Sequence, residues 1–198
     1  MRVDLQHVAD FVEENSRVLD LGCGDGELLA HLQESKNIKG YGIEKDQEAI
    51  EECIRRGVNV IEHDLNFGLD RFPDDSFDIV VMTETLQALE SPRKLLKELL
   101  RIANRCIVSF PNFGHWQCRF QLLFRGRMPV AEHLPHQWYD TPNIHLCTFR
   151  DFDELCQSEG LQVVERSVVD PQYRKVSKKS GLSNLFGTTG FYVLGRPQ

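Results

Sequence analysis

Three glycines within five residues, Gly22, Gly24 and Gly26, follow an apolar run that contains Asp20. Glycine permits the positive φ angles of a tight turn and lets backbone amides approach a ligand closely. A loop that binds a dinucleotide reads GxGxxG and has few acids near its pyrophosphate. This loop reads GxGxG and carries both Asp20 and Asp25. The pattern therefore favours a ligand with a cationic end over a pyrophosphate.

Further polar side chains fall where three later strands should end. Glu44 ends the second predicted strand, Asp64 the third and Thr83 the fourth, with Glu84 and Thr85 next along the chain. Ligands of open α/β sheets bind at the carboxyl ends of the strands, so we expect these side chains beside the glycine loop. Ionised carboxylates accept strong hydrogen bonds from hydroxyl and amino groups. Two alternatives remain: Glu44 could cap the next helix, and Asp64 could be a simple turn residue.

Taken together, these elements resemble the binding site of class I S-adenosylmethionine (SAM) methyltransferases. The resemblance implies that Glu44 holds both ribose hydroxyls of SAM or S-adenosylhomocysteine, and that Asp64 lies near the adenine amino group. The cofactor-binding residues that it implies are Asp20, Gly22, Cys23, Gly24, Gly26, Glu44, Lys45, Asp64, Leu65 and Thr83. A SAM loop names no methyl acceptor, because the cofactor carries the reactive group. No Asn-Pro-Pro-Tyr or Asp-Pro-Pro-Tyr motif follows the fourth strand, which argues against methylation of amide or exocyclic amino nitrogens.

The elements that must hold such a site are visible in the hydrophobic pattern. Apolar runs predict strands at 17–21, 39–44, 58–64, 77–83, 106–110, 161–169 and 191–194. Amphipathic segments predict helices at 27–34 and 46–56, one that starts at Ser91-Pro92, and one that a capping box opens at Thr148. The alternation predicts a Rossmann-like α/β fold with a mostly parallel sheet and helices on both faces. The class I resemblance implies seven strands with an antiparallel last strand.

Length and composition indicate one domain over residues 1–198 with an elaboration at about 111–147. Residues 1–100 carry 22 acids and 11 bases, which argues against general nucleic-acid binding. No apolar run approaches a membrane span, and the first residues do not form a signal peptide. Six scattered cysteines without a CxxC motif favour reduced thiols in a cytoplasmic protein. The polar stretch at 173–184 is expected to be a mobile surface loop.

The elaboration is rich in histidine, tryptophan and arginine. His133 and His136 make a poor metal site, since Pro135 disrupts the helix that would align them, and we expect no metal. Each histidine of the segment could be a general base or an ordinary structural residue. Tryptophan, tyrosine and arginine commonly anchor interfaces. The residues expected to form a partner or substrate surface are His115, Trp116, Arg125, Arg127, Trp138 and Tyr139.

Longer sequence motifs indicate a particular family within the class I methyltransferase fold. The stretches SFPNFGHW, LLFRGRMP and QWYDTPNIHLCTFRDFDELC, with the opening DLQHVADFVEENSRVLDLGCGDG, resemble the family of the methionine biosynthesis protein MetW. This resemblance implies a role in L-methionine biosynthesis as the activating partner of a homoserine O-acyltransferase. An active SAM-dependent methyltransferase with an unknown small-molecule acceptor is the alternative. A third possibility joins both, with SAM as a regulator of the partner.

Overall fold

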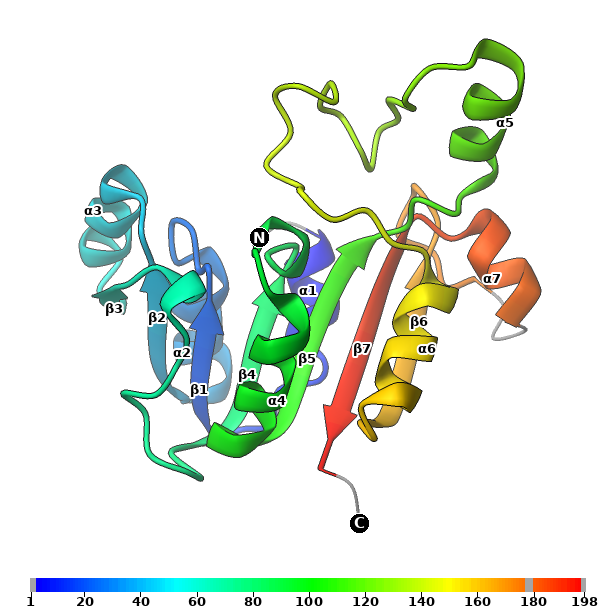
Figure 1. Ribbon diagram of the computed structural model, residues 1–198. Coiled ribbons are helices and arrows are strands. Elements are labelled where there is room, and N and C mark those ends of the chain that lie inside the picture. The colour runs from blue at the N-terminus through cyan, green and yellow to red at the C-terminus, as the bar shows by residue number, and fades with distance from the viewer. Residues whose placement is uncertain (1–2, 177–179, 197–198) are drawn as a thin grey trace.

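The computed structural model describes residues 3–176 and 180–196, and its centre is a seven-stranded sheet (Figure 1). In chain order the strands are β1 (Arg17–Leu21), β2 (Lys39–Glu44), β3 (Asn59–Glu62), β4 (Phe77–Thr83), β5 (Ala103–Pro111), β6 (Gln162–Val169) and β7 (Thr189–Gly195). They lie in the order β3-β2-β1-β4-β5-β7-β6. Strands β1 to β5 pair in parallel, whereas β7 is antiparallel to β5 and β6. The predicted fold, including its antiparallel last strand, is confirmed.

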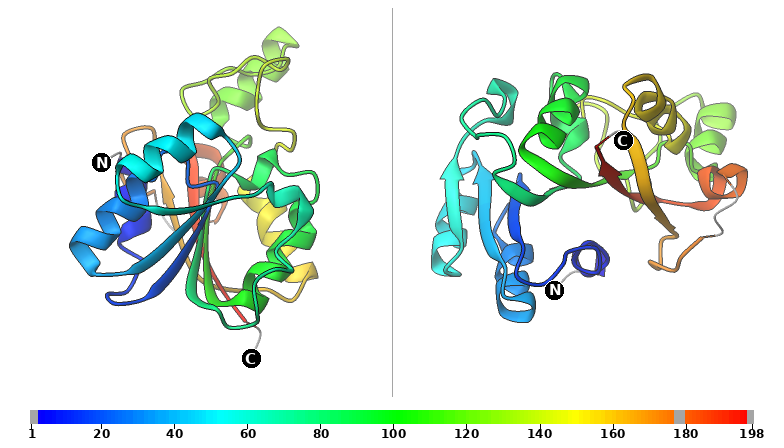
Figure 2. Two further views of the ribbon diagram at one scale, coloured as in Figure 1. Left: turned by 90° about the vertical axis from the view of Figure 1, so that its left-hand side faces the viewer. Right: turned by 90° about the horizontal axis from the view of Figure 1, so that it is seen from below.

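Helices cover both faces of the sheet (Figure 2). The helices are α1 (Val3–Ala9), α2 (Glu27–Lys36), α3 (Gln47–Arg55), α4 (Pro92–Ile102), α5 (Trp116–Arg125), α6 (Phe149–Ser158) and α7 (Ser180–Phe186). Two short 3-10 helices, η1 (Leu65–Phe67) and η2 (Leu86–Ala88), follow β3 and β4. Val80 and Met82 of β4 pack with α4 and α6, while Ile79 and Val81 pack with α1 and α2. Because successive residues of a strand face opposite sides, a strand covered on both sides is apolar throughout.

Local sequence signals set several helix starts. Asp46 caps α3 by accepting a hydrogen bond of 3.0 Å from the Ala49 amide. The capping box that opens α6 is present, with reciprocal bonds between Thr148 and Asp151. The side chain before Pro92 makes no capping bond, so the start of α4 depends on the proline itself.

The expectation of a surface loop at 173–184 is wrong at its C-terminal end, where α7 begins. Residues 177–179 lie outside the described part of the chain. Within α7, Ser183 and Asn184 are buried. The Asn184 side chain accepts from the Phe149 amide at 3.1 Å, and its carbonyl accepts from Asn112 at 3.0 Å. Polar residues can thus fill an interior position when backbone groups satisfy them.

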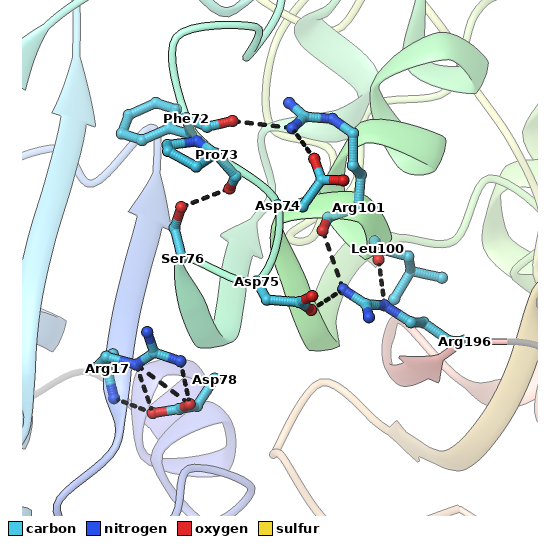
Figure 3. Close-up of polar contacts among 10 residues, drawn as sticks. All are labelled: Arg17, Phe72, Pro73, Asp74, Asp75, Ser76, Asp78, Leu100, Arg101 and Arg196. Carbon is cyan, nitrogen blue, oxygen red and sulfur yellow. Dashed lines mark hydrogen bonds and ion pairs between the residues drawn. The ribbon is translucent and has the colours of Figure 1, made fainter.

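Three arginines fix the segment that leads into β4, at the end of the sheet away from the glycine loop (Figure 3). Arg17, the first residue of β1, forms a two-pronged ion pair with Asp78 at 2.7 Å. Arg101 of α4 pairs with Asp74 at 2.7 Å, and Arg196 pairs with Asp75 and donates to the carbonyl of Leu100 at 2.6 Å. These contacts hold the amino-terminal ends of the strands and leave the opposite edge to carry a site.

The elaboration rises above the edge at which the parallel strands end (Figure 1). It contains α5, which the sequence did not reveal, and otherwise irregular chain as far as α6. Two of its backbone amides, those of Ile144 and His145, donate to the Gln87 carbonyl on η2 at 2.9 and 3.0 Å. The elaboration therefore rests on the turn that follows β4. No helix in the described ranges is long and apolar enough to span a membrane.

Candidate functional site

The glycine loop joins β1 to α2, and each of its three glycines has a positive φ: 72° at Gly22, 54° at Gly24 and 76° at Gly26. A Cβ at the first would lie 2.6 Å from Thr85 Oγ1, and one at the third would lie 2.9 Å from Cys53 Sγ. No atom lies within 4 Å of a Cβ built at Gly24. The outer glycines are therefore required by packing, while the middle one leaves open space that a ligand can approach.

Glu44, the last residue of β2, connects this loop to the start of α3. Its carboxylate accepts from the backbone amides of Gly24 at 3.0 Å, Lys45 at 2.7 Å and Asp46 at 3.0 Å. The cap of α3 itself is Asp46, so Glu44 is not that helix's capping residue. A carboxylate offers about four lone-pair positions, so roughly one remains for an outside donor.

A cavity of about 200 Å³ lies between the glycine loop and the turns after β3 and β4. It brings together five of the ten residues expected to bind a cofactor, namely Gly22, Glu44, Lys45, Asp64 and Leu65. Asp20, Cys23, Gly24, Gly26 and Thr83 are not part of its lining, although the glycine loop that contains three of them borders it. The other lining residues are Ile43, His63, Asn66, Glu84, Thr85, Ala88 and Leu89.

Asp20 is the buried acid of this site, with 1% of its surface exposed. Its Oδ1 atom has no hydrogen-bond partner among the described residues. Burial, and then the charge of Glu44, raise the pKa of its carboxyl to about 7. An unpartnered buried acceptor is rare enough to need an explanation. A ligand with hydroxyl or cationic donor groups would supply one.

Asp64 forms the far wall of the cavity and also starts η1. Its carboxylate accepts from the Asn66 amide at 2.9 Å and pairs with the Lys45 ammonium at 3.6 Å. The pKa of this carboxyl is lowered, chiefly by the backbone hydrogen bond and also by the charge of Lys45. Asp64 is therefore a turn residue and an ionised wall of the cavity at once.

The turn after β4 contributes another wall of the cavity, through Glu84 and Thr85. Thr85 Oγ1 donates to the Thr83 carbonyl at 2.9 Å, and Thr83 itself is not part of the lining. Glu84 has a φ of 51° although it is not glycine. Backbone strain of this kind clusters at functional sites. Ala88 and Leu89 were not predictable from the sequence, because they are ordinary apolar residues that reach the cavity only through the position of η2.

Most residues expected to form a partner surface are exposed, but His115 is not. Trp138 and Tyr139 are 71% and 70% exposed, and the arginines at 125 and 127 are also exposed. His115 is 2% exposed, since its ring packs against His133 with 5.1 Å between the ring centroids. Burial lowers the pKa of His115 to about 4, so its ring is neutral at pH 7. The expectation that His115 lies on a surface is corrected accordingly.

No residue of the segment 111–147 contributes to the lining of the cavity. Its four histidines lie elsewhere, and none is placed as a general base facing this cavity. Within the described ranges, no group of three or more histidine, cysteine or acidic residues could hold a metal ion.

Comparison with known proteins identifies the family of this chain. Residues 2–194 match the family model described as "Methionine biosynthesis protein MetW". The chain belongs to the MetW family. It is 38% identical over 164 residues to the "Bifunctional methionine biosynthesis protein MetXA/MetW" of Rhodopirellula baltica, which covers 78% of this chain and 26% of that protein. An ajmaline N-methyltransferase of Rauvolfia serpentina is 28% identical over 43% of this MetW-family chain and 32% of its own length.

Solved structures share the fold of this MetW-family chain. A SAM-dependent methyltransferase from Archaeoglobus fulgidus has a TM-score of 0.72 at 18% identity, over 98% of this chain and 92% of that one. A chain from the complex between the Haloferax volcanii Trm112 methyltransferase activator and a putative methyltransferase has a TM-score of 0.70 at 19% identity, over 98% and 88%. The fold is therefore that of class I methyltransferases. The matches span about a quarter and a third, respectively, of the length of these two curated relatives, the R. baltica protein and the ajmaline N-methyltransferase.

Proposed function

We propose that this MetW-family protein binds SAM or S-adenosylhomocysteine and acts in L-methionine biosynthesis as the activating partner of a homoserine O-acyltransferase. One observation carries the proposal most directly. The cavity presents the acceptor oxygens of Glu44 and Asp64 beside the glycine loop, yet the aromatic elaboration stands outside it and faces solvent. The R. baltica relative, whose name joins MetXA and MetW in a single polypeptide, supports the choice of partner.

Residues that line the cavity, or that adjoin it on β1 and the glycine loop, fit the groups of SAM. Glu44 keeps about one acceptor position for a ribose hydroxyl, and the ionised carboxylate of Asp64 suits an adenine amino group. The unpartnered oxygen of Asp20 and the open space at Gly24 suit the cationic amino-acid end of the ligand. When bound, SAM would supply a sulfonium methyl carbon that a nucleophile can attack, with S-adenosylhomocysteine as the leaving group. These residues themselves bind and orient the ligand.

Methyl transfer to a small molecule is the second candidate function, and the well-formed cavity favours it. Against it, the elaboration supplies no wall and no base to the cavity. A screen with methyl-labelled SAM against a metabolite extract distinguishes the two. Incorporation of label into a small molecule that depends on Glu44 would establish the enzyme, and its absence with intact SAM binding supports the partner role.

The ligand is tested with a matched pair of glycine variants. Gly24 and Gly160 both have a positive φ and both have open space around a new Cβ. Each change to alanine should therefore cost the same ~1–2 kcal/mol of stability. In calorimetry with SAM and with S-adenosylhomocysteine, Gly24→Ala should bind at least tenfold more weakly than wild type. Gly160→Ala should bind normally. Equal affinity in the two variants, or no binding by wild type, would contradict the SAM assignment.

The partner role is tested with the purified acyltransferase of the same organism. Adding the MetW-family chain should produce a complex on size exclusion and raise the rate of acyl transfer to homoserine. No complex and no change in rate would overturn the partner role. A Gly24→Ala strain that grows without methionine, while its protein fails to bind SAM, would show that partner activation does not need the ligand.

A further inference from the structure

Helix α5 carries a row of exposed aromatic side chains along one face. Trp116, Phe120 and Phe124 are spaced four residues apart and are 39%, 53% and 72% exposed. Their rings contact in sequence, with 5.9 Å and 5.4 Å between successive centroids. Cys118 is the single buried residue of this helix. We call these three residues the aromatic ladder. Exposed apolar surface of this extent commonly marks an interaction site.

A groove of about 570 Å³ runs beside the aromatic ladder. Its other wall consists of residues 130–133 together with Pro171 and Gln172. The ladder therefore does not stand alone on a convex helix, but forms one side of a recess. A recess of this kind can accept side chains of another protein.

The aromatic ladder is held in place in the free protein. Gln121 exchanges two hydrogen bonds with the backbone of Val130, at 3.0 and 3.2 Å. Arg119 donates to the Gly114 carbonyl at 2.6 Å, which ties the first turn of α5 to the segment after β5. A surface that is ordered before binding loses less conformational entropy when a partner arrives. These contacts indicate that the surface is already ordered before a partner binds.

Charge selects the kind of partner. Arg125 and Arg127 lie at the end of the ladder and are exposed, and neither has an acidic group within 4 Å in the part of the chain that the structure describes. The groove lining also contains Glu132, but with Arg125 and Arg127 the surface carries net positive charge, and a symmetric dimer through this face would place two such surfaces against each other. A different protein with carboxylates at its rim fits better.

We propose that the aromatic ladder and its groove form the docking surface for the homoserine O-acyltransferase, with acidic residues of that enzyme facing Arg125 and Arg127. This inference rests on the partner role proposed above and names the face that performs it. Aromatic side chains fill the centre of the interface, and the arginines lie at its rim, where they guide the encounter.

The test compares two exposed positions on different helices. Phe124→Glu removes a ladder residue, and Ile54→Glu makes a similar change on α3, where the side chain is 64% exposed. Each variant is first checked for wild-type urea unfolding and SAM binding. Affinity for the purified acyltransferase and stimulation of its rate are then measured. Phe124→Glu should weaken binding at least tenfold and lose most of the stimulation, while Ile54→Glu should match wild type. Arg125→Glu should slow association, most strongly at low salt.

The possible outcomes distinguish a wrong docking surface from a wrong partner role. If wild type binds and Phe124→Glu binds as well as Ile54→Glu, the docking surface is wrong and the partner role stands. If wild type does not bind the acyltransferase, the partner role is wrong and the inference falls with it. If light scattering shows that wild type alone is a dimer that Phe124→Glu dissociates, the occupant is a second copy and the assignment to the acyltransferase is overturned.

Discussion

Replacing Asp20 with asparagine should stabilise the ligand-free protein and weaken its ligand binding. Asp20 is buried beside the glycine loop, and burial raises the pKa of its carboxyl from 3.8 to about 7. In the unfolded chain this carboxyl ionises above about pH 4, whereas in the folded chain it keeps its proton until about pH 7. The free energy of unfolding therefore falls as pH rises between these values, because the folded state binds more protons. The asparagine side chain does not ionise, so the free energy of unfolding of the variant should not fall for this reason as pH rises.

The size of the effect follows from the pKa difference. A shift of about three pKa units corresponds to roughly 4 kcal/mol at pH 8, where the folded protein must hold the ionised carboxylate. At pH 5 the same group costs roughly 1.7 kcal/mol. The stability gained by Asp20→Asn should thus grow by roughly 2.5 kcal/mol between pH 5 and pH 8. Ligand affinity should move in the opposite direction, by about tenfold or more at pH 8, since a charged acceptor is lost.

Urea unfolding of both proteins at pH 5 and pH 8, without ligand, measures the difference, and calorimetry with S-adenosylhomocysteine measures the affinity. Asp25→Asn is the control, because Asp25 lies nearby on the glycine loop but is exposed. It should show no comparable growth in stability with pH. A stability difference for Asp20→Asn that is the same at both pH values, or a variant less stable than wild type at pH 8, would refute the buried-charge argument.

Three further expectations concern the scaffold. Gly26→Ala should destabilise the protein by about 2–3 kcal/mol in urea, because the residue has a φ of 76° and its Cβ would lie 2.9 Å from Cys53 Sγ. Placing it in a Cys53→Ala background should reduce that cost, and full additivity would exclude the clash. Thr148→Ala removes half of the capping box with Asp151 and should cost about 1 kcal/mol of unfolding free energy. A thiol titration at pH 8 should find the buried cysteines inert and the partly exposed Cys147 slow, since burial raises its pKa to about 12, whereas all six should react in denaturant. Several fast thiols in the native protein would contradict the described burial.

The strands were predictable because burial on both sides leaves a continuous apolar run. The bounds of β1, β2 and β4 agree with those expected, whereas β5 starts three residues earlier, at Ala103. Asn104 and Arg105 of that strand are polar and exposed, so the apolar run that marks the strand in the sequence begins only after them. Polarity at the end of a strand thus conceals its true length.

Helix α5 was not predictable for a related reason. A helix is recognised in sequence by the apolar stripe that it buries against the core. Of α5, the described structure buries Cys118 alone, and the aromatic residues face outward. Its apolar residues do recur every four positions, but they form the exposed aromatic ladder and do not pack against the core. In the cavity, acids and glycines were predictable from their chemistry, whereas Ala88 and Leu89 depend on the course of the chain after β4.

The exposed aromatic ladder also bears on how much of this protein a cell can hold. A chain with three exposed aromatic rings on one helix is prone to associate with other proteins when no partner covers them. On the partner role proposed above, we expect the abundance of this chain to follow that of the acyltransferase. In the R. baltica relative, whose name joins MetXA and MetW, both units occur in one polypeptide and are therefore made in equal numbers.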